Sequence, residues 1–140
     1  MEARGAGLKV DQIMSKKVVS ISADDTLDVV REIMELAHVR HLPVVRRGAL
    51  VGVVSQRDLL SASLSTVMGL PAEEQIRFLK GVKIAEVMSA PPLSISGEQT
   101  VQQAARLMAE HKIGCLPVVD GTTLVGIVTE TDVLGFFAQS

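Results

Sequence analysis

The sequence has almost no aromatic residues. Tryptophan and tyrosine are absent, and three phenylalanines bring the aromatic share to only 2%. Proteins that bind single-stranded nucleic acid usually stack its bases on aromatic side chains. The formal net charge of -2 also supplies no positive field that would attract a phosphate backbone. Nucleic acid is therefore not an expected partner.

Cysteine and long apolar runs are also scarce. The single cysteine, Cys115, cannot form an internal disulfide, which is the usage expected in a reducing cytoplasm. The longest apolar stretches, such as residues 50–54, fall far short of the roughly 18 residues that span a membrane. Residues 1–8 lack the apolar core of a signal peptide. We therefore expect a cytoplasmic protein without membrane insertion.

Aliphatic side chains are abundant instead. Hydrophobic residues make up 47% of the 140 residues, and an ordinary soluble domain reaches such a share only when glycine is counted as well. A chain of this length is long enough to bury a sizeable core. The composition therefore excludes a disordered chain and indicates one domain or two very small ones.

The sequence contains two copies of one unit. Residues 10–61 align with residues 84–135 without a gap, and identical pairs recur along the whole alignment. The identical blocks are Met14-Ser15 with Met88-Ser89, Ser20–Ser22 with Ser94–Ser96, Leu42–Val45 with Leu116–Val119, and Leu50–Gly52 with Leu124–Gly126. Such self-similarity indicates an internal duplication.

Each copy predicts the order strand, helix, strand, strand, helix. Short β-rich runs at 18–21 and 93–95 precede helical patterns at 27–37 and 101–111, with Thr26 and Thr100 as expected N-caps. A Leu-Pro-Val-Val run, a polar turn and a second apolar run then predict a hairpin. A closing helix begins near Gln56 in one copy and near Glu130 in the other. The fold class is α/β (α+β), with two β-α-β-β-α repeats.

The chain divides into two repeats and a connector. We expect repeat 1 over residues 8–66, a helical connector over 67–81 and repeat 2 over 82–140. The connector contains Pro71 followed by alanine and two glutamates, which is a good helix start, and Gly81 as a stop.

In each copy a hydroxyl residue stands three positions before an aspartate, where a strand meets a helix. The pairs are Ser55 with Asp58 and Thr129 with Asp132. These groups could hydrogen-bond the two hydroxyls of a ribose, and the free amides of the helix start favour phosphate. The alternative is structural, because the hydroxyl could cap the helix and the carboxylate could interact with the helix dipole.

The repeated pattern resembles a CBS (cystathionine-β-synthase) domain. The resemblance rests on the Met-Ser lead-in, the Leu-Pro-Val-Val run and the Leu-x-Gly run that ends in Ser/Thr-x-x-Asp, in this order and twice, over residues 10–138. Two such copies resemble a CBS pair, or Bateman module. The resemblance implies repeats packed around a pseudo-two-fold axis, with clefts between them for adenine-containing ligands such as AMP, ADP, ATP or S-adenosylmethionine.

The resemblance also implies a regulatory, non-catalytic protein. It would be a homodimer that acts on an effector protein of unknown identity, with an adenine nucleotide as regulatory ligand and no required cofactor. The alternative is a structural, dimerisation or interaction module with empty clefts.

Site residues follow from the same resemblance. Those that would hold the ribose are Ser55, Asp58, Thr129 and Asp132. Arg40 and His41 would bind phosphate, facing Thr129 and Asp132 of the other repeat. Their counterparts Gly114 and Cys115 would face Ser55 and Asp58, so the two clefts would be unequal. Arg40 and His41 could instead be ordinary solvated residues before a strand.

The adenine would lie in an aliphatic slot. The residues expected to line it are Val18, Val19, Ile21, Val39, Pro92, Leu93, Ile95 and Ile113. Each of these side chains could instead belong to the core.

Basic residues also gather in the first repeat and acidic ones in the second. This distribution indicates either a phosphate-attracting rim, a head-to-tail dimer contact or simply a solvated charged face.

No catalytic or metal site is expected. His38 and His41 are close in sequence, but no carboxylate or thiol completes a familiar set of metal ligands. Cys115 has no obvious histidine partner apart from His111. A small buried side chain is therefore a better interpretation of Cys115 than a nucleophile.

Overall fold

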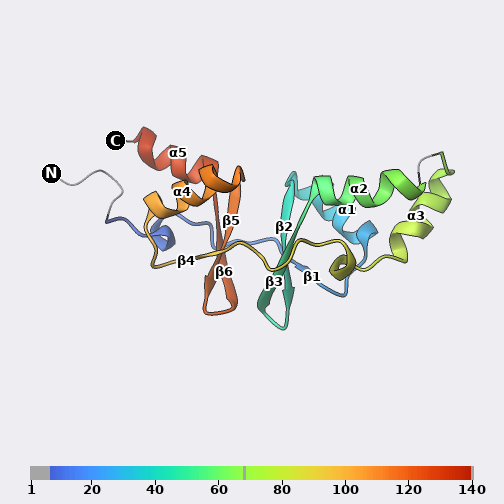
Figure 1. Ribbon diagram of the computed structural model, residues 1–140, viewed down its shortest axis with the longest axis horizontal. Coiled ribbons are helices and arrows are strands. Elements are labelled where there is room, and N and C mark those ends of the chain that lie inside the picture. Colours follow the sequence, from blue (N-terminus) through green and yellow to red (C-terminus); the bar gives the residue numbers. More distant parts are fainter. Residues whose placement is uncertain (1–6, 68, 140) are drawn as a thin grey trace. The chain divides into compact units, whose positions relative to one another are not determined.

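The structure is a computed structural model that describes residues 7–67 and 69–139 (Figure 1). It divides into two compact units. We call Val19–Pro92 the middle unit, and residues 7–18 together with 93–139 the terminal unit. Each unit contains its own cluster of buried aliphatic side chains.

The predicted order of elements is confirmed in both units. The middle unit contains β1 (Ile21–Ser22), α1 (Leu27–Ala37), β2 (His41–Arg46), β3 (Ala49–Ser55), α2 (Gln56–Val67), α3 (Ala72–Lys80) and the 3-10 turn η2 (Ile84–Glu86). The terminal unit contains the 3-10 turn η1 (Val10–Gln12), β4 (Ile95–Ser96), α4 (Val101–His111), β5 (Cys115–Asp120), β6 (Thr123–Thr129) and α5 (Glu130–Ala138). The fold is therefore a tandem β-α-β-β-α arrangement of the mixed α and β class.

Each unit contains a three-stranded sheet with the same pairing. β1 runs parallel to β2, and β2 is antiparallel to β3. β4, β5 and β6 repeat this arrangement. The register places His41 opposite Ser55 in one hairpin and Cys115 opposite Thr129 in the other. The first residue of each Leu-Pro-Val-Val strand therefore lies beside the hydroxyl residue that ends the next strand.

The helices α1 and α4 bury one apolar face each. In α1 the buried residues Leu27, Val30 and Met34 recur at helical spacing. Thr100 caps α4 as expected, because its hydroxyl accepts the Gln103 amide at 3.1 Å. Thr26 occupies the N-cap position of α1 without a side-chain bond to the helix backbone.

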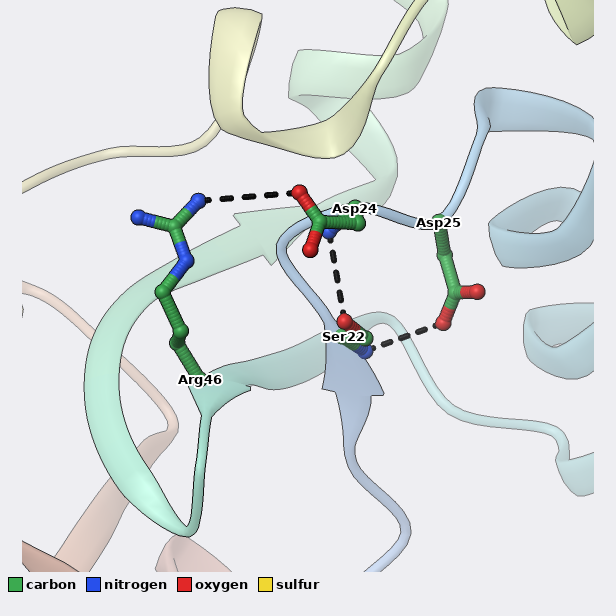
Figure 2. Close-up of polar contacts among 4 residues, drawn as sticks. All are labelled: Ser22, Asp24, Asp25 and Arg46. Carbon is green, nitrogen blue, oxygen red and sulfur yellow. Dashed lines mark hydrogen bonds and ion pairs between the residues drawn. The ribbon is translucent and has the colours of Figure 1, made fainter.

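A polar turn follows the first strand of each repeat. In the middle unit the Ser22 hydroxyl accepts the Asp24 amide at 3.2 Å, and Asp25 accepts the Ser22 amide at 2.9 Å (Figure 2). Arg46 at the end of β2 lies 3.8 Å from the Asp24 carboxylate. The terminal unit keeps the same turn around Ser96, so the duplicated sequence retains this bend between strand and helix.

The lead-in of each repeat packs in the unit of the other repeat. Val10, at the start of repeat 1, is fully buried in the core of the terminal unit, and Ile84, at the start of repeat 2, is fully buried in the middle unit. The backbone of Ser15 pairs with Ile127, and that of Ser89 pairs with Val53. The two units are therefore built by an exchange of lead-in segments. The division of the sequence into repeats over 8–66 and 82–140 with a connector over 67–81 stays a prediction.

Glycines allow the lead-in segments to lie close to the strands. A Cβ at Gly126 would be 2.5 Å from the Met14 sulfur, and a Cβ at Gly52 would be 2.5 Å from the Met88 sulfur. The Met-Ser and Leu-x-Gly blocks that repeat in the sequence are thus the two sides of one packing contact, with each methionine seated on a glycine of the strand.

Candidate functional site

The hydroxyl and aspartate of each repeat form a reciprocal pair at a helix start. The Ser55 amide donates to Asp58 Oδ2 at 2.9 Å, and the Asp58 amide donates to Ser55 Oγ at 3.0 Å. Thr129 and Asp132 do the same at 2.9 and 3.2 Å. This is a capping box with aspartate as its acid. The structural alternative expected from the sequence is therefore realised at the start of both α2 and α5.

Capping leaves these groups able to bind a ligand. A hydroxyl that accepts an amide still carries its own donor, and a carboxylate has about four lone-pair sites, so one amide leaves further acceptor capacity. Ser55, Asp58, Thr129 and Asp132 are all half-buried. A pair fixed by its own backbone thus has a defined orientation and keeps free hydrogen-bonding capacity.

The start of β2 is tied to the start of α2. The carbonyl of Arg40 accepts the Gln56 amide at 2.7 Å, and His41 lies opposite Ser55 in the hairpin register. The terminal unit repeats this link, since the carbonyl of Gly114 accepts the Glu130 amide at 2.9 Å. Within each unit, the residues before the Leu-Pro-Val-Val strand therefore lie next to that repeat's own hydroxyl and aspartate.

The environment of His41 keeps its imidazole neutral near pH 7. Burial lowers the pKa of His41, Asp58 acts in the opposite direction, and the Arg40 guanidinium lowers the pKa further. A neutral imidazole offers one donor and one acceptor nitrogen. His41 is half-buried and Arg40 is exposed, so of the two side chains Arg40 is the one that carries positive charge at the surface.

The environment of Cys115 shifts a pKa upward, whereas the environment of His41 shifts one downward. Burial raises the pKa of the Cys115 thiol, and the Glu130 carboxylate raises the pKa further. The nucleophilic form of cysteine is the thiolate. A thiol held in its neutral form is a weak nucleophile. Cys115 is intermediate in burial, and its interpretation as a small buried side chain stays a prediction.

The structure thus gathers the predicted polar residues into two groups, one in each unit. Ser55 and Asp58 lie with Arg40 and His41, whereas Thr129 and Asp132 lie with Gly114 and Cys115. The pairing of Arg40 and His41 with Thr129 and Asp132 stays an untested prediction. The arrangement within the middle unit offers Ser55 and Asp58 as the alternative pair.

The residues expected to line an adenine slot differ widely in exposure. Ile21 and Ile95 lie in the two cores, at 2% and 1% exposure, which favours the core alternative for both. Val19 is 44% exposed. The remaining five are intermediate in burial: Val18, Val39, Pro92, Leu93 and Ile113. A lining role stays a prediction for these residues and for Val19.

One residue near the terminal group was not among the predicted site residues. The Glu130 carboxylate lies over Gly114, because a Cβ built on Gly114 would be 2.5 Å from Glu130 Oε1. The signal in the sequence is the alignment of the two copies, which sets Gly114 against Arg40 and Glu130 against Gln56.

Neither a cluster of metal ligands nor a membrane-spanning helix occurs in residues 7–67 and 69–139. Within those ranges no group of three or more histidine, cysteine, aspartate or glutamate side chains could hold a metal ion. No helix of the same ranges has the length and apolar character to cross a membrane.

Comparison with known proteins points to one family. A family model for the CBS domain matches residues 10–65 and 84–139. A CBS domain-containing protein of Dictyostelium discoideum is 35% identical over 127 residues, which cover 89% of this chain and 88% of that protein.

Two solved structures with bound ligands are also similar. The structure of CBSX2 in complex with AMP is 29% identical, with a TM-score of 0.80, and the match covers 95% of this chain and 98% of that one. The CBS domain pair of protein MJ0100, in complex with 5-methylthioadenosine and S-adenosyl-L-methionine, is 25% identical with a TM-score of 0.74, and the match covers 94% and 96%. The chain therefore belongs to the CBS domain family and contains a pair of CBS repeats.

Proposed function

We propose that the protein is a regulatory module that binds an adenine nucleotide and passes the change to a partner protein. The observation that carries the proposal is the group formed by Arg40, His41, Ser55 and Asp58, within one unit of a fold whose relative CBSX2 was solved with AMP. This group combines acceptors suited to a ribose with a cation suited to a phosphate.

The ribose would be held by the capping pair. Ser55 keeps a hydroxyl donor and Asp58 keeps carboxylate acceptors after their mutual bonds. In the terminal unit we assign the same role to Thr129 and Asp132. Because the backbone fixes these side chains before any ligand arrives, less conformational entropy is lost on binding.

The phosphate would be held by Arg40 and His41. A guanidinium offers a planar fork that matches a phosphate, and His41 can donate one hydrogen bond in its neutral form. The strand register and the bond from the Gln56 amide to the Arg40 carbonyl support placing this phosphate in the middle unit, beside Ser55 and Asp58.

The adenine would pack against half-exposed aliphatic side chains. In the middle unit, Val19 and Val39 would contact the adenine. Pro92, Leu93 and Ile113 are further candidates for this contact. Ligand binding regulates a partner only if the ligand prefers one of two arrangements of the protein. We include in the proposal a homodimer, an effector protein and a cytoplasmic location.

Calorimetric titration of the purified protein with AMP, ATP and S-adenosylmethionine tests the proposal. We expect a saturable heat for at least one of the three ligands. A protein that is folded by circular dichroism and gives no heat with any of them would contradict the nucleotide-sensing function. That outcome would favour the second candidate, a structural or interaction module whose exposed apolar residues, such as Leu36 and Leu134, contact another chain.

A further inference from the structure

The two pseudo-equivalent sites carry opposite charge. In the middle unit the residue before β2 and the first turn of α2 bring two cations, Arg40 and Arg57, and one anion, Asp58. The aligned positions of the terminal unit are Gly114, Thr131 and Asp132, so the terminal unit has no cation at any of them. Glu130 adds a second anion there, where the middle unit has the neutral Gln56.

The two units also differ in which charged side chain lies at the residue before the Leu-Pro-Val-Val strand. The Glu130 carboxylate lies over residue 114, and it can do so because residue 114 is glycine. In the middle unit the same backbone position carries the side chain of Arg40. A negative charge in the terminal unit therefore occupies the place from which a positive charge extends in the middle unit. The effect of Glu130 on the Cys115 thiol is a consequence of the same closeness.

Charge of this sign disfavours a phosphate in the terminal unit. Like charges that approach closely near a protein surface repel one another. The capping pair Thr129–Asp132 remains available for a ribose. Lys112 lines the same groove as Glu130, so it offsets one of the two negative charges of Glu130 and Asp132. The terminal site thus keeps the features that suit a nucleoside, while its remaining excess of negative charge opposes an anionic 5′ substituent.

We infer that the terminal unit binds an adenosine derivative whose 5′ substituent is positively charged, with Glu130 as the residue that selects it, while the middle unit takes the phosphorylated ligand. This inference rests on the proposed function, because it assumes that both capping pairs hold a ribose. S-Adenosylmethionine carries a sulfonium at the 5′ position and is the probe. S-Adenosylhomocysteine, which has a neutral sulfur there, is the matched ligand.

The test is calorimetry on wild type, Glu130→Gln and Gln56→Glu. Glu130→Gln removes the charge and keeps the backbone amide that bonds Gly114, so the fold should be retained, as the unfolding midpoint would show. We expect S-adenosylmethionine to bind roughly five- to tenfold more weakly to this variant, the effect of about 1 kcal/mol of lost attraction. S-Adenosylhomocysteine should be affected less, and the binding of AMP by the middle unit should be unaffected.

Gln56→Glu places a carboxylate at the equivalent position of the middle unit. This variant should bind AMP more weakly than the wild type, and its binding of S-adenosylmethionine should be unchanged. Equal binding of S-adenosylmethionine by wild type and Glu130→Gln would overturn the inference. The inference would also be overturned if a wild-type protein that binds AMP did not bind S-adenosylmethionine at all. The same holds if S-adenosylmethionine binding were lost in Asp58→Ala but not in Asp132→Ala. These outcomes would leave the proposed binding of an adenine nucleotide intact. If the wild type bound none of the adenine compounds, the proposed function itself would be contradicted.

Discussion

Among single residues, His41 gives the most direct pH dependence. Burial and Arg40 lower its pKa in the folded protein, and Asp58 only partly offsets them. The unfolded chain therefore binds more protons than the folded one below the ordinary histidine pKa of about 6.5. The stability contributed by neutral His41 is fully present above that pH and is lost as the pH falls through the folded pKa.

We expect the free energy of unfolding of the wild type to fall more steeply between about pH 7 and pH 5.5 than that of His41→Gln, which has no titratable group there. Urea unfolding at the two pH values measures this difference, and NMR titration of the imidazole measures the pKa. A His41 pKa above the ordinary value would contradict the proposed balance of burial and charge.

Cys115 provides a second test at this scale. Because burial and Glu130 raise the pKa of the thiol, we expect alkylation by iodoacetamide at about pH 8.5 to be several-fold slower than that of an unstructured cysteine peptide. Glu130→Gln should increase the rate, since it removes one of the two causes. The urea-unfolded protein is the control, and a native rate equal to the unfolded rate would argue against this environment.

The sequence predicted the single residues of the capping pairs but not their surroundings. The chemistry of Ser55–Asp58 is local, so its two alternative roles could both be named from four consecutive residues. The position of Glu130 over Gly114 depends on a contact between the start of α5 and the residue before β5. Residues so far apart in sequence come together only through the hairpin register, and a single sequence gives no measure of that proximity.

Among the elements, the lead-in segments determine how the units are built. Ile84 precedes repeat 2 in the sequence but is fully buried in the core of the middle unit, and Val10 is buried in the terminal unit. The local pattern predicted the order of strands and helices, because hydrophobic periodicity and turns are local signals. It could not reveal the exchange, because a buried isoleucine looks the same whichever core it enters.

We expect Ile84→Ala to lower the free energy of unfolding by about 2–5 kcal/mol, the usual cost of such a cavity in a core. The loss of hydrogen-exchange protection should be concentrated in α1, within the middle unit. Val10→Ala is the matched variant, and it should affect α4 instead. Loss of protection in α4 on mutation of Ile84 would show that the lead-in belongs to the other unit.

At the scale of the whole molecule, the homodimer is the next expectation to test. A groove of about 440 Å³ between α4 and α5 is lined by Leu134, which is 65% exposed, together with other mostly apolar side chains and with Glu130 of the proposed ligand site. Exposed apolar patches of this kind commonly mark contacts between chains. The part of α5 that carries Leu134 is therefore the candidate dimer contact.

We therefore expect a dimer in sedimentation experiments, and a shift to monomer for Leu134→Asp. Ile76→Asp, at an exposed apolar position of α3, is the matched control and should remain dimeric. A monomeric wild type, or a Leu134→Asp protein that is still a dimer, would exclude this face as the dimer contact.

The central claim is that the middle unit holds a nucleotide phosphate and ribose through its own residues. Calorimetry with AMP on wild type, Asp58→Ala and Asp132→Ala tests it most directly, because the two aspartates occupy equivalent positions in equivalent capping pairs. We expect AMP to bind the wild type and Asp132→Ala but not Asp58→Ala. Loss of AMP binding in Asp132→Ala with retention in Asp58→Ala would contradict the claim and support the pairing of Arg40 and His41 with the other repeat.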